Sequence, residues 1–383
     1  MSGGASALRW AAALGNADWC VMGPLVTALA AAWHTDVATV TAGIASYSLG
    51  YGCALPLWGV MADRYGPGRS LRLGLLCATA ASVACVFCPG PDWWVVLRMA
   101  AGASFAAVTP SVSLCCEYMA SASERHRAYA GITTVAAATA VATPFLATLV
   151  TRIGSWRQTF AVVALLAAVT MCRLRVDHPV TPTASGPDHR TRFTAGYGRR
   201  GRTRAAYWTV IGIGAAEGVA LLTLPALLLP ALAMSGAWAA TSLAPALYAA
   251  AVCGSAALLR RHGRTWEPTR LLVLGGLTGA SGAGLVAAWP GTAVLCCGAL
   301  MLGVAWGCLH TTLQTLLPRL LPSPVRARAA SLFAASAMLT SSVTIPIGTA
   351  LLLEGLHAAV FTSGALACAG LTGLAVTLAR RWT

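Results

Sequence analysis

Long apolar segments separated by short polar turns make up nearly the whole chain. Hydrophobic residues account for 57% of its 383 positions and charged residues for only 10%, whereas a soluble domain carries about 25% charged residues. A chain of this composition cannot cover a folded surface with polar groups, so we expect an integral membrane protein. A spanning helix needs roughly 20 apolar residues, and a chain of this length accommodates about twelve of them.

The apolar segments predict an all-α membrane protein with twelve transmembrane helices in two pseudo-symmetric six-helix bundles. The bundles cover residues 1–174 and 205–383. The predicted spans of the first are about Leu8–Trp33, Ala38–Ala62, Leu71–Cys88, Trp93–Met119, Ala128–Val150 and Trp156–Leu174. Those of the second are about Ala205–Leu229, Gly236–Leu259, Arg270–Trp289, Ala293–Leu316, Ala329–Leu353 and Leu356–Leu378.

The segment between the bundles, residues 175–204, is basic and rich in Pro, Gly, Thr and His, and it has no apolar periodicity. We interpret it as a disordered or loosely ordered cytoplasmic linker. Contact of its arginines with lipid headgroups is a second interpretation. A solvated linker that also fixes the topology is favoured over it.

The positive charge of the chain is distributed unevenly across the predicted membrane. The net charge is +15, and all 26 basic residues are arginines. Of these, 23 fall in turns on one face, Arg152 and Arg157 fall on the other, and Arg98 lies within a span. Cytoplasmic loops carry such an excess, so we expect a multi-pass plasma-membrane protein with both termini in the cytoplasm. A nucleic-acid-binding protein would need its arginines on one soluble surface, so we expect no nucleic-acid partner.

The thirteen cysteines lie nearly all inside apolar segments. Cys85 and Cys88 form a C-x-x-C pair, but the sequence offers no second pair or histidine cluster beside it, so packing is favoured over a redox or metal site. The sequence also has no nucleotide-binding loop and no catalytic constellation. We therefore expect neither an enzyme nor an ATP-driven pump, and no metal ion or cofactor.

The turn between the second and third predicted spans combines one acid with two arginines. It reads Gly59-Val60-Met61-Ala62-Asp63-Arg64-Tyr65-Gly66-Pro67-Gly68-Arg69. It resembles the signature loop of the major facilitator superfamily, G-x-L-A-D-R-x-G-R, except that Met61 replaces Leu and Pro67-Gly68 moves the next basic residue to Arg69. The equivalent turn of the second half keeps R-x-G-R but has Arg260 in place of Asp63. One good and one degraded signature are typical of this superfamily.

The resemblance implies a transporter that works by alternating access. It also implies a conformational latch formed by Gly59, Asp63, Arg64, Gly66 and Arg69. In this latch Asp63 lies at the amino-terminal end of the eleventh span, where a helix dipole favours a carboxylate. The arginine that pairs with it is left open among Arg125, Arg127 and Arg328.

Two acids lie at nearly the same depth in equivalent spans of the two halves. Asp18 follows Trp10 by eight residues and Glu217 follows Trp208 by nine, or about 12 and 13 Å at 1.5 Å per residue. A charge in hydrocarbon costs about 2.5–3.5 kcal/mol even on lenient scales. In the family these spans line the central cavity, so our hypothesis is that one or both carboxylates bind the coupling proton. The alternatives are an acid satisfied by neighbouring helices, or one reached by water without coupling.

Arg98 begins a run that looks like the second motif of the family, R-x-x-Q-G-x-G-A-A. Arg98 and Gly102 match, whereas Ala101 and Ser104 depart from the pattern. The resemblance implies a cavity charge that takes part in proton transfer or holds a carboxylate of the first span; a purely structural role is the alternative. Depths counted from the span ends leave about 10 Å between Arg98 and Asp18 along the membrane normal. A direct pair is therefore not expected unless the span ends are misplaced or the side chains reach far.

Several further residues are candidates for the wall of a substrate cavity. His310, near Gln314 in the tenth span, is interpreted as a buried, hydrogen-bonded histidine rather than a substrate contact. Pro144 matches the proline of the family's antiporter motif G-P-x-x-G-G, but Ala or Thr replaces each glycine, which weakens the case for efflux. The remaining candidates, with packing as an equal alternative, are Asn16, Trp19, Tyr248 and Trp306.

The sequence favours proton-coupled export of a small, partly apolar drug or metabolite, because the spans carry few charges. A sugar would need more Asn, Gln and Asp across the inner helices. Uptake of a small metabolite by proton symport is the alternative, and a non-transporting membrane sensor is a third, less favoured class. The expected partners are a small-molecule substrate, protons and the lipid bilayer, and we expect a monomer.

Overall fold

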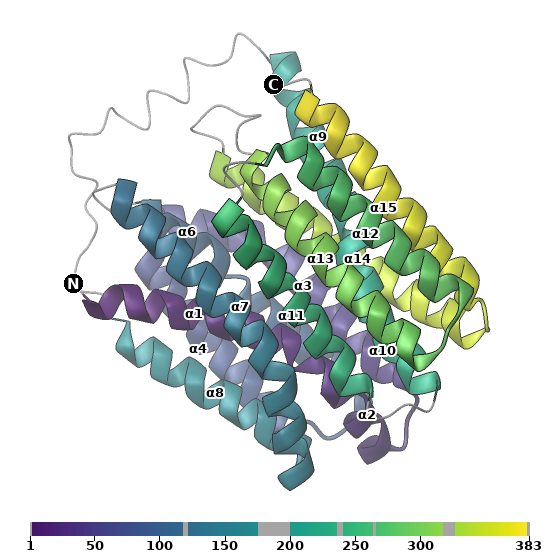
Figure 1. The fold of residues 1–383 in the computed structure, drawn as a ribbon. Helices are drawn as coiled ribbons and strands as arrows, with labels where there is room; N and C mark the ends of the chain where they lie inside the picture. Colours follow the sequence, from purple (N-terminus) through teal and green to yellow (C-terminus); the bar gives the residue numbers. More distant parts are fainter. Residues whose placement is uncertain are drawn as a thin grey trace, which may run out of the picture.

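The fold is a bundle of helices. The computed structural model describes residues 2–117, 122–174, 200–235, 240–262, 266–316 and 326–380, and within these ranges every regular element is a helix (Figure 1). The all-α class predicted from the sequence is therefore confirmed. By length and composition, seven of the described helices are apolar enough to cross a membrane.

In its described residues, the amino-terminal half contains eight helices. They are α1 (Ser2–Cys20), α2 (Met22–Trp33), α3 (Val37–Tyr65), α4 (Pro67–Val86), α5 (Pro91–Phe105), α6 (Val108–Glu117), α7 (Ala122–Ile153) and α8 (Trp156–Arg173). The first predicted span corresponds to α1 and α2 together, and the fourth to α5 and α6.

The described part of the carboxy-terminal half contains eight elements. They are α9 (Arg200–Glu217), the π-helix η3 (Gly218–Thr223), α10 (Leu224–Met234), α11 (Ala240–His262), α12 (Pro268–Ala288), α13 (Thr292–Leu316), α14 (Arg326–Leu353) and α15 (His357–Arg380). Most of the predicted linker lies outside the described residues. Its last five positions, residues 200–204, belong to α9 rather than to a linker.

Prolines explain the three interrupted spans. A proline removes one backbone hydrogen bond and crowds the carbonyl four residues before it. Pro24 stands four residues after Cys20, where α1 ends, and Pro110 stands four residues after Ala106, just beyond α5. Pro225 follows Leu221 by the same spacing, and Leu221 lies inside the π-helix. The apolar pattern continues through each interruption, so the sequence alone suggested single unbroken spans.

The signature loop is a single residue between two helices. Gly66 joins α3 to α4 with φ of 90°, a left-handed conformation that favours glycine. Pro67 then begins α4, where its missing N–H costs nothing. This turn places the end of α3 and the start of α4 at one end of the bundle, which we call the arginine-rich end.

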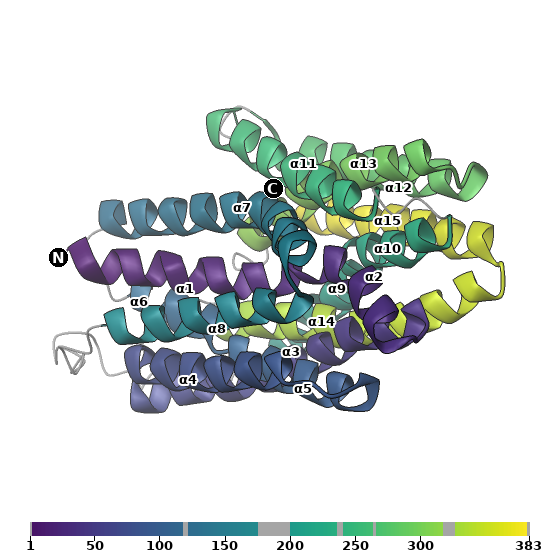
Figure 2. The ribbon, with the colours of Figure 1, turned by 90° about the horizontal axis from the view of Figure 1, so that it is seen from below.

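The two halves pack against each other as well as within themselves. Helix α3 packs on α14 and α7 on α11, so each contact joins one half to the other (Figure 2). A mixed apolar cluster lies away from the arginine-rich end and combines Val21, Leu25 and Leu29 with Ala226 and Leu229. We call this cluster the seal, because it closes the space between the halves on that side.

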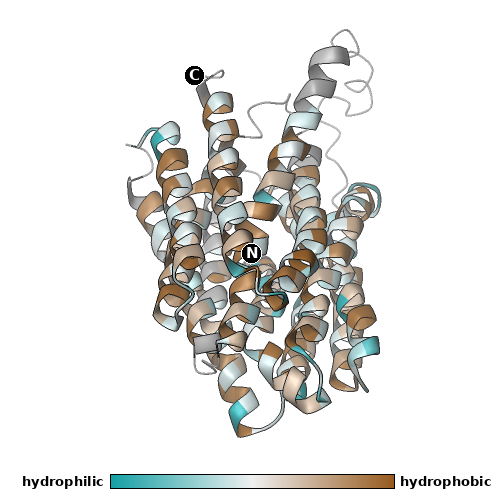
Figure 3. Ribbon diagram, turned by 90° about the vertical axis from the view of Figure 1, so that its right-hand side faces the viewer, coloured by the Kyte–Doolittle hydropathy of each residue, from teal (hydrophilic) through white to brown (hydrophobic). Residues whose placement is uncertain are grey.

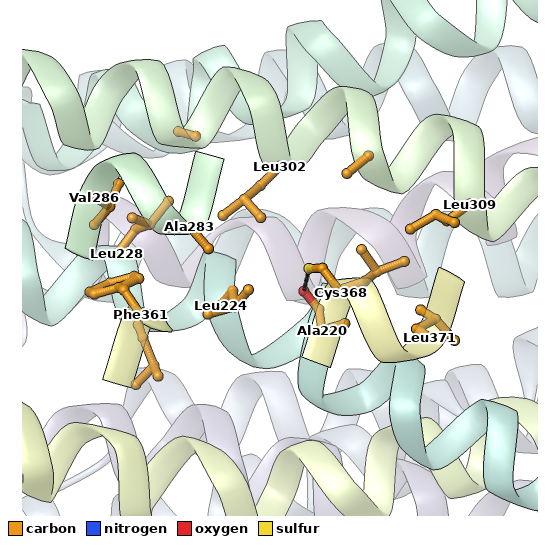
Figure 4. Close-up of a cluster of buried hydrophobic side chains, with 14 of the residues drawn as sticks. Ala220, Leu224, Leu228, Ala283, Val286, Leu302, Leu309, Phe361, Cys368 and Leu371 are labelled. Carbon is orange, nitrogen blue, oxygen red and sulfur yellow. Dashed lines mark hydrogen bonds between the residues drawn. The ribbon is translucent and has the colours of Figure 1, made fainter. Parts of the chain in front are cut away.

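The core of the carboxy-terminal half gathers around η3 (Figure 4). In a π-helix the carbonyl of Ala220 would pair with the N–H of residue 225, which is a proline and has none. Cys368 of α15 donates its S–H to this carbonyl at 3.7 Å. Many large apolar residues of the described helices are exposed, as expected for a lipid-facing surface. Hydrophobic positions recur along the helices in the ribbon coloured by hydropathy (Figure 3).

Candidate functional site

A cavity of about 180 Å³ lies between the two halves. The amino-terminal half contributes α1, α2, α3 and α7 to its wall, and the carboxy-terminal half contributes η3, α10, α11 and α13. The wall includes five of the residues suggested by the sequence, namely Asn16, Trp19, Pro144, Tyr248 and Trp306. It is mostly apolar and aromatic, and no charged side chain belongs to it in the described part of the chain.

Asn16 offers the cavity an oriented amide. Its Nδ2 donates to the carbonyl of Ala12 at 2.9 Å, one turn earlier on α1. This bond uses a donor and leaves the amide oxygen as an acceptor. A ligand hydroxyl or N–H group is therefore the natural partner for Asn16.

Two of the three interrupted spans break next to a buried acid. Helix α1 ends two residues after Asp18, and η3 begins one residue after Glu217. The two acids are 0% and 1% exposed. Each therefore lies where regular helical hydrogen bonding stops, close to residues of the cavity wall.

Asp18 forms an ion pair with Arg98. Arg98 Nη1 lies 3.1 Å from both carboxylate oxygens of Asp18, and Nη2 donates to the main-chain carbonyl of Asp18 at 3.2 Å. Both side chains are fully buried. The two guanidinium nitrogens thus donate to two different oxygens of Asp18, one on the side chain and one on the main chain. Hydrogen bonds between ionised groups, such as the one to the carboxylate, are stronger than neutral ones.

Aromatic rings enclose this ion pair. The guanidinium carbon of Arg98 lies 4.7 Å from the ring centroid of Tyr47 and 5.6 Å from those of Trp94 and Phe160. Trp19, on the cavity wall, packs on Tyr47 with ring centroids 5.6 Å apart. Among the described residues, Asp18 and Arg98 are not part of the cavity wall, and both are fully buried.

The contact between Arg98 and Asp18 is the one that depths counted from the span ends disfavoured, and it agrees with the holding of a first-span carboxylate that the family resemblance implied. The count was off because Trp10 was taken as the membrane edge, whereas α1 begins at Ser2, so Trp10 is already more than two turns into the helix. A role of Arg98 as a cavity charge stays a prediction; aromatic residues of α3, α5 and α8 cover it in the structure.

Glu217 forms its contact with a histidine. Oε1 of Glu217 is hydrogen-bonded to Nδ1 of His310. His310 stacks on Trp306 with ring centroids 4.4 Å apart, and Trp306 belongs to the cavity wall. Among the described residues, Oε2 of Glu217 has no hydrogen-bond partner although it is buried. His310 is hydrogen-bonded, as the sequence suggested, but its side chain is 23% exposed and so is only partly buried.

The two acids therefore differ in chemistry. Arginine stays protonated at any physiological pH, so Arg98 supplies Asp18 with a permanent counter-charge. Glu217 is paired instead with a histidine, a side chain that can be neutral or charged. Each of the two acids also keeps one buried carboxylate oxygen without a hydrogen-bond partner among the described residues.

Other predicted residues lie elsewhere or cannot be placed. Asp63, Arg64 and Arg69 are exposed at the arginine-rich end, and Asp63 has no ion pair among the described residues. The side chains of its possible partners, Arg125, Arg127 and Arg328, lie outside the described residues, as does that of Gln314. The latch therefore stays a prediction.

Sequence reasoning missed the residues that surround the ion pair. Tyr47 contacts both Trp19 and Arg98, and Phe160 closes the cage from α8. The one signal available was the spacing of Tyr47 and Tyr51, which places two aromatic rings on one face of a helix. Cys20 and Met22, also on the wall, gave no signal beyond their position in an apolar segment.

The comparisons with known proteins agree with this architecture. The family model described as Major Facilitator Superfamily matches residues 10–345. The chain belongs to the major facilitator superfamily. It is therefore a membrane transport protein, as the signature loop predicted. No match was found among curated protein sequences.

Solved structures of other transporters in this superfamily share the fold. A POT family transporter in complex with 5-aminolevulinic acid is 11% identical with a TM-score of 0.74, and the match covers 99% of this chain and 96% of that one. A D-xylose-proton symporter is 14% identical with a TM-score of 0.74, covering 98% and 95%. A peptide transporter POT in complex with sulfate is 15% identical with a TM-score of 0.75, covering 99% and 94%.

Proposed function

We propose that this protein is a proton-coupled exporter of a small, partly apolar compound. The observation that carries the proposal is the Glu217–His310 pair, which adjoins the cavity through Trp306. It supplies a titratable site beside a substrate-sized space between two packed halves. Uptake by proton symport is the second candidate, because one structural neighbour is a D-xylose-proton symporter.

The cavity wall supports the substrate class. Drug-sized ligands occupy pockets of about 300–1,000 Å³, whereas this cavity has about 180 Å³. Its wall carries few polar groups, among them the Asn16 amide and the Tyr248 hydroxyl. A compact compound with an apolar body and one or two hydrogen-bonding groups fits such a wall better than a sugar does.

In the proposed mechanism the proton occupies the Glu217–His310 pair. With Glu217 protonated, its O–H donates to the neutral Nδ1 of His310 and no net charge is buried. Loss of that proton leaves a carboxylate that needs a new counter-charge or contact with water. The π-helix η3 begins at the residue after Glu217. The change in the charge of Glu217 therefore acts on the irregular turn of this span.

Opening of the seal would then expose the cavity to the other face. We place the arginine-rich end and both termini in the cytoplasm of a plasma-membrane protein, with a monomer as the transporting unit. In the structure the halves meet at the seal through Leu25, Leu29 and Leu229. Separation of these residues, with closure at the arginine-rich end by the Asp63 latch, would complete the cycle.

The test is transport of a panel of compounds into everted membrane vesicles with an imposed pH gradient. Accumulation driven by an acidic lumen means export, because protons leave as substrate enters. Accumulation driven by an acidic exterior means symport and supports the second candidate. Substrate transport rates that do not change with a pH gradient of either sign would contradict proton coupling.

A further inference from the structure

A groove on the outside of the amino-terminal half has no role in the proposed transport path. It lies between α4 and α8, which run side by side (Figures 1 and 2). Arg72, Leu73, Leu76, Met171 and Cys172 line it, and its volume is about 430 Å³. Leu73 and Leu76 are 42% and 52% exposed, so the groove opens toward lipid rather than toward the central cavity.

Arg72 is held at the arginine-rich end of this groove. Its Nη2 donates to the main-chain carbonyl of Leu174, the residue that caps the carboxy-terminal end of α8. The end of a helix carries partial negative charge, which favours a cation there. Its Nε is buried and has no hydrogen-bond partner among the described residues. The guanidinium is thus fixed in place while part of its five-donor capacity remains unused.

Two more arginines lie next to Arg72. Arg69 precedes it by one turn on α4, and Arg173 adjoins both Cys172 of the groove and Leu174. Both are exposed, and none of the three forms an ion pair within the described ranges. Among the residues that the structure describes, no acidic residue lines the groove. One end of this apolar, lipid-facing groove therefore carries arginines that have no acidic partner in the described part of the chain.

We propose that this groove binds one anionic phospholipid. The guanidinium of Arg72 holds the headgroup phosphate, with Arg69 and Arg173 adding positive charge at its rim. An acyl chain lies along Leu73, Leu76 and Met171. Guanidinium groups match phosphate oxygens in geometry and charge, and basic pockets between transmembrane helices are suited to anionic headgroups. The lipid comes from the leaflet at the arginine-rich end.

The second half of the chain provides an internal comparison. Helix α12 begins with Pro268 as α4 begins with Pro67, and it packs on α15 as α4 packs on α8. Counting from these prolines, Arg270 stands at the place of Arg69, but Val273 stands at the place of Arg72. The equivalent position thus lacks the anchored guanidinium, which predicts a lipid site in the first half only. Arg270 is exposed and pairs with Glu267 at 3.6 Å, so it serves as a matched control.

Native mass spectrometry of the purified full-length protein tests the site. The protein in detergent is titrated with phosphatidylglycerol or with phosphatidylcholine of the same acyl chains. We expect preferential retention of one phosphatidylglycerol. Arg72→Gln should lose about tenfold in affinity, which corresponds to about 1.4 kcal/mol, because the variant loses hydrogen bonds from a charged group to the phosphate. Arg270→Gln should bind as the wild type does. Equal retention of the two lipids, or unchanged binding by Arg72→Gln, would overturn the proposal.

A second measurement needs no variant and so does not depend on folding of a mutant. Cys172 is exposed in the groove, and Cys297 is exposed on α13 of the other half. Phosphatidylglycerol should slow the reaction of Cys172 with N-ethylmaleimide several-fold, measured on peptides by mass spectrometry, and leave Cys297 unchanged. Equal rates at Cys172 with and without the lipid would contradict the site. Equal protection by inorganic phosphate alone would mean that the ligand is a free anion and not a lipid.

Discussion

At the residue scale, the two buried acids of this transporter have different partners and therefore different tasks. Arg98 neutralises Asp18 permanently inside an aromatic cage. Glu217 is hydrogen-bonded to His310, whose ring stacks on Trp306 of the cavity wall. Of the two carboxylates that the sequence suggested for proton coupling, we therefore propose Glu217.

Replacement of Glu217 by Gln tests this assignment. The amide keeps a hydrogen bond to His310 but cannot release a proton. We expect Glu217→Gln to lose accumulation driven by a pH gradient while it keeps exchange of substrate at equal pH. Both are measured in vesicles with labelled substrate. If gradient-driven accumulation persisted at the wild-type level, Glu217 would not be the coupling residue.

Replacement of Asp18 by Asn tests the structural role of the other acid. It leaves Arg98 charged and unpaired in the core, and loss of one partner of a buried pair costs about 3–5 kcal/mol. We expect Asp18→Asn to unfold at a markedly lower temperature in detergent. The double variant Asp18→Asn with Arg98→Met removes the orphan charge and should recover part of the loss. A single variant as stable as the wild type would contradict this role.

The sequence could predict the kinds of residue at the site but not their contacts. Asp18, Glu217 and Arg98 stand out because charges are rare in apolar segments. Their partners do not, since Tyr47, Trp94 and Phe160 are ordinary residues of a membrane helix. Only the packing of α3, α5 and α8 brings those three rings into contact with the guanidinium of Arg98.

At the element scale, the apolar runs predicted the positions of the helices, and local chemistry determined where they break. Run length is a robust signal for a membrane span. The helix breaks before Pro24 and Pro110 depend on which backbone carbonyl each proline ring crowds. The π-helix before Pro225 depends also on its neighbouring helix, because Cys368 of α15 donates to the carbonyl of Ala220. The sequence therefore fixes the spans better than it fixes the irregular turns beside the acids.

The start of α3 gives a pH-dependent prediction. Asp36 accepts a hydrogen bond from the N–H of Thr39 at 2.7 Å, and the hydrogen bonds from Thr39 lower the pKa of the Asp36 carboxyl below its usual range. This stabilisation is present above the unfolded-state pKa and is lost as the pH falls through the lower folded-state pKa. Asp36→Ala should lose about 1 kcal/mol at most.

Melting temperatures of the wild type, Asp36→Ala and Asp36→Asn between neutral and acidic pH would check the cap. Asparagine is also a good helix cap and has no charge to lose. The wild type and Asp36→Ala should therefore converge at low pH, whereas Asp36→Asn should show no such loss from this site. Parallel curves for all three proteins would argue against the cap.

The seal gives a prediction about the movement of α2. A Cβ atom added at Gly23 would meet Cγ of Pro245 on α11 at 2.9 Å and a side-chain atom of Leu229 at 3.6 Å. Gly23→Val should therefore prevent the two halves from closing on that side. Because Cys20 lies on the cavity wall, we expect its labelling by a membrane-impermeant thiol reagent from that side to rise several-fold.

Gly291 provides the control for this variant. It lies beyond α12, and an added Cβ would meet nothing within 4 Å. Gly291→Val should leave both transport and the labelling of Cys20 unchanged. If Cys20 in Gly23→Val were labelled only at the wild-type rate, the contact between residue 23 and Pro245 would not limit separation of the two halves.

At the scale of the whole molecule, two halves with similar topology hold different centres. The superfamily fold survives at 11–15% identity to the solved transporters compared above, because the arrangement of spans depends on apolar length and turns more than on particular side chains. The repeat predicted the equivalence of the first and seventh spans. It could not predict that one centre holds a permanent ion pair and the other a titratable pair.

The caged arginine has a mechanical consequence. The guanidinium of Arg98, on α5, contacts Asp18 of α1, Tyr47 of α3 and Phe160 of α8. Four helices are therefore joined at a single, fully buried point. The other half has a π-turn at the corresponding depth. Deformation during each turnover should then be unequal: one half rotates as a stiff block, and the other bends.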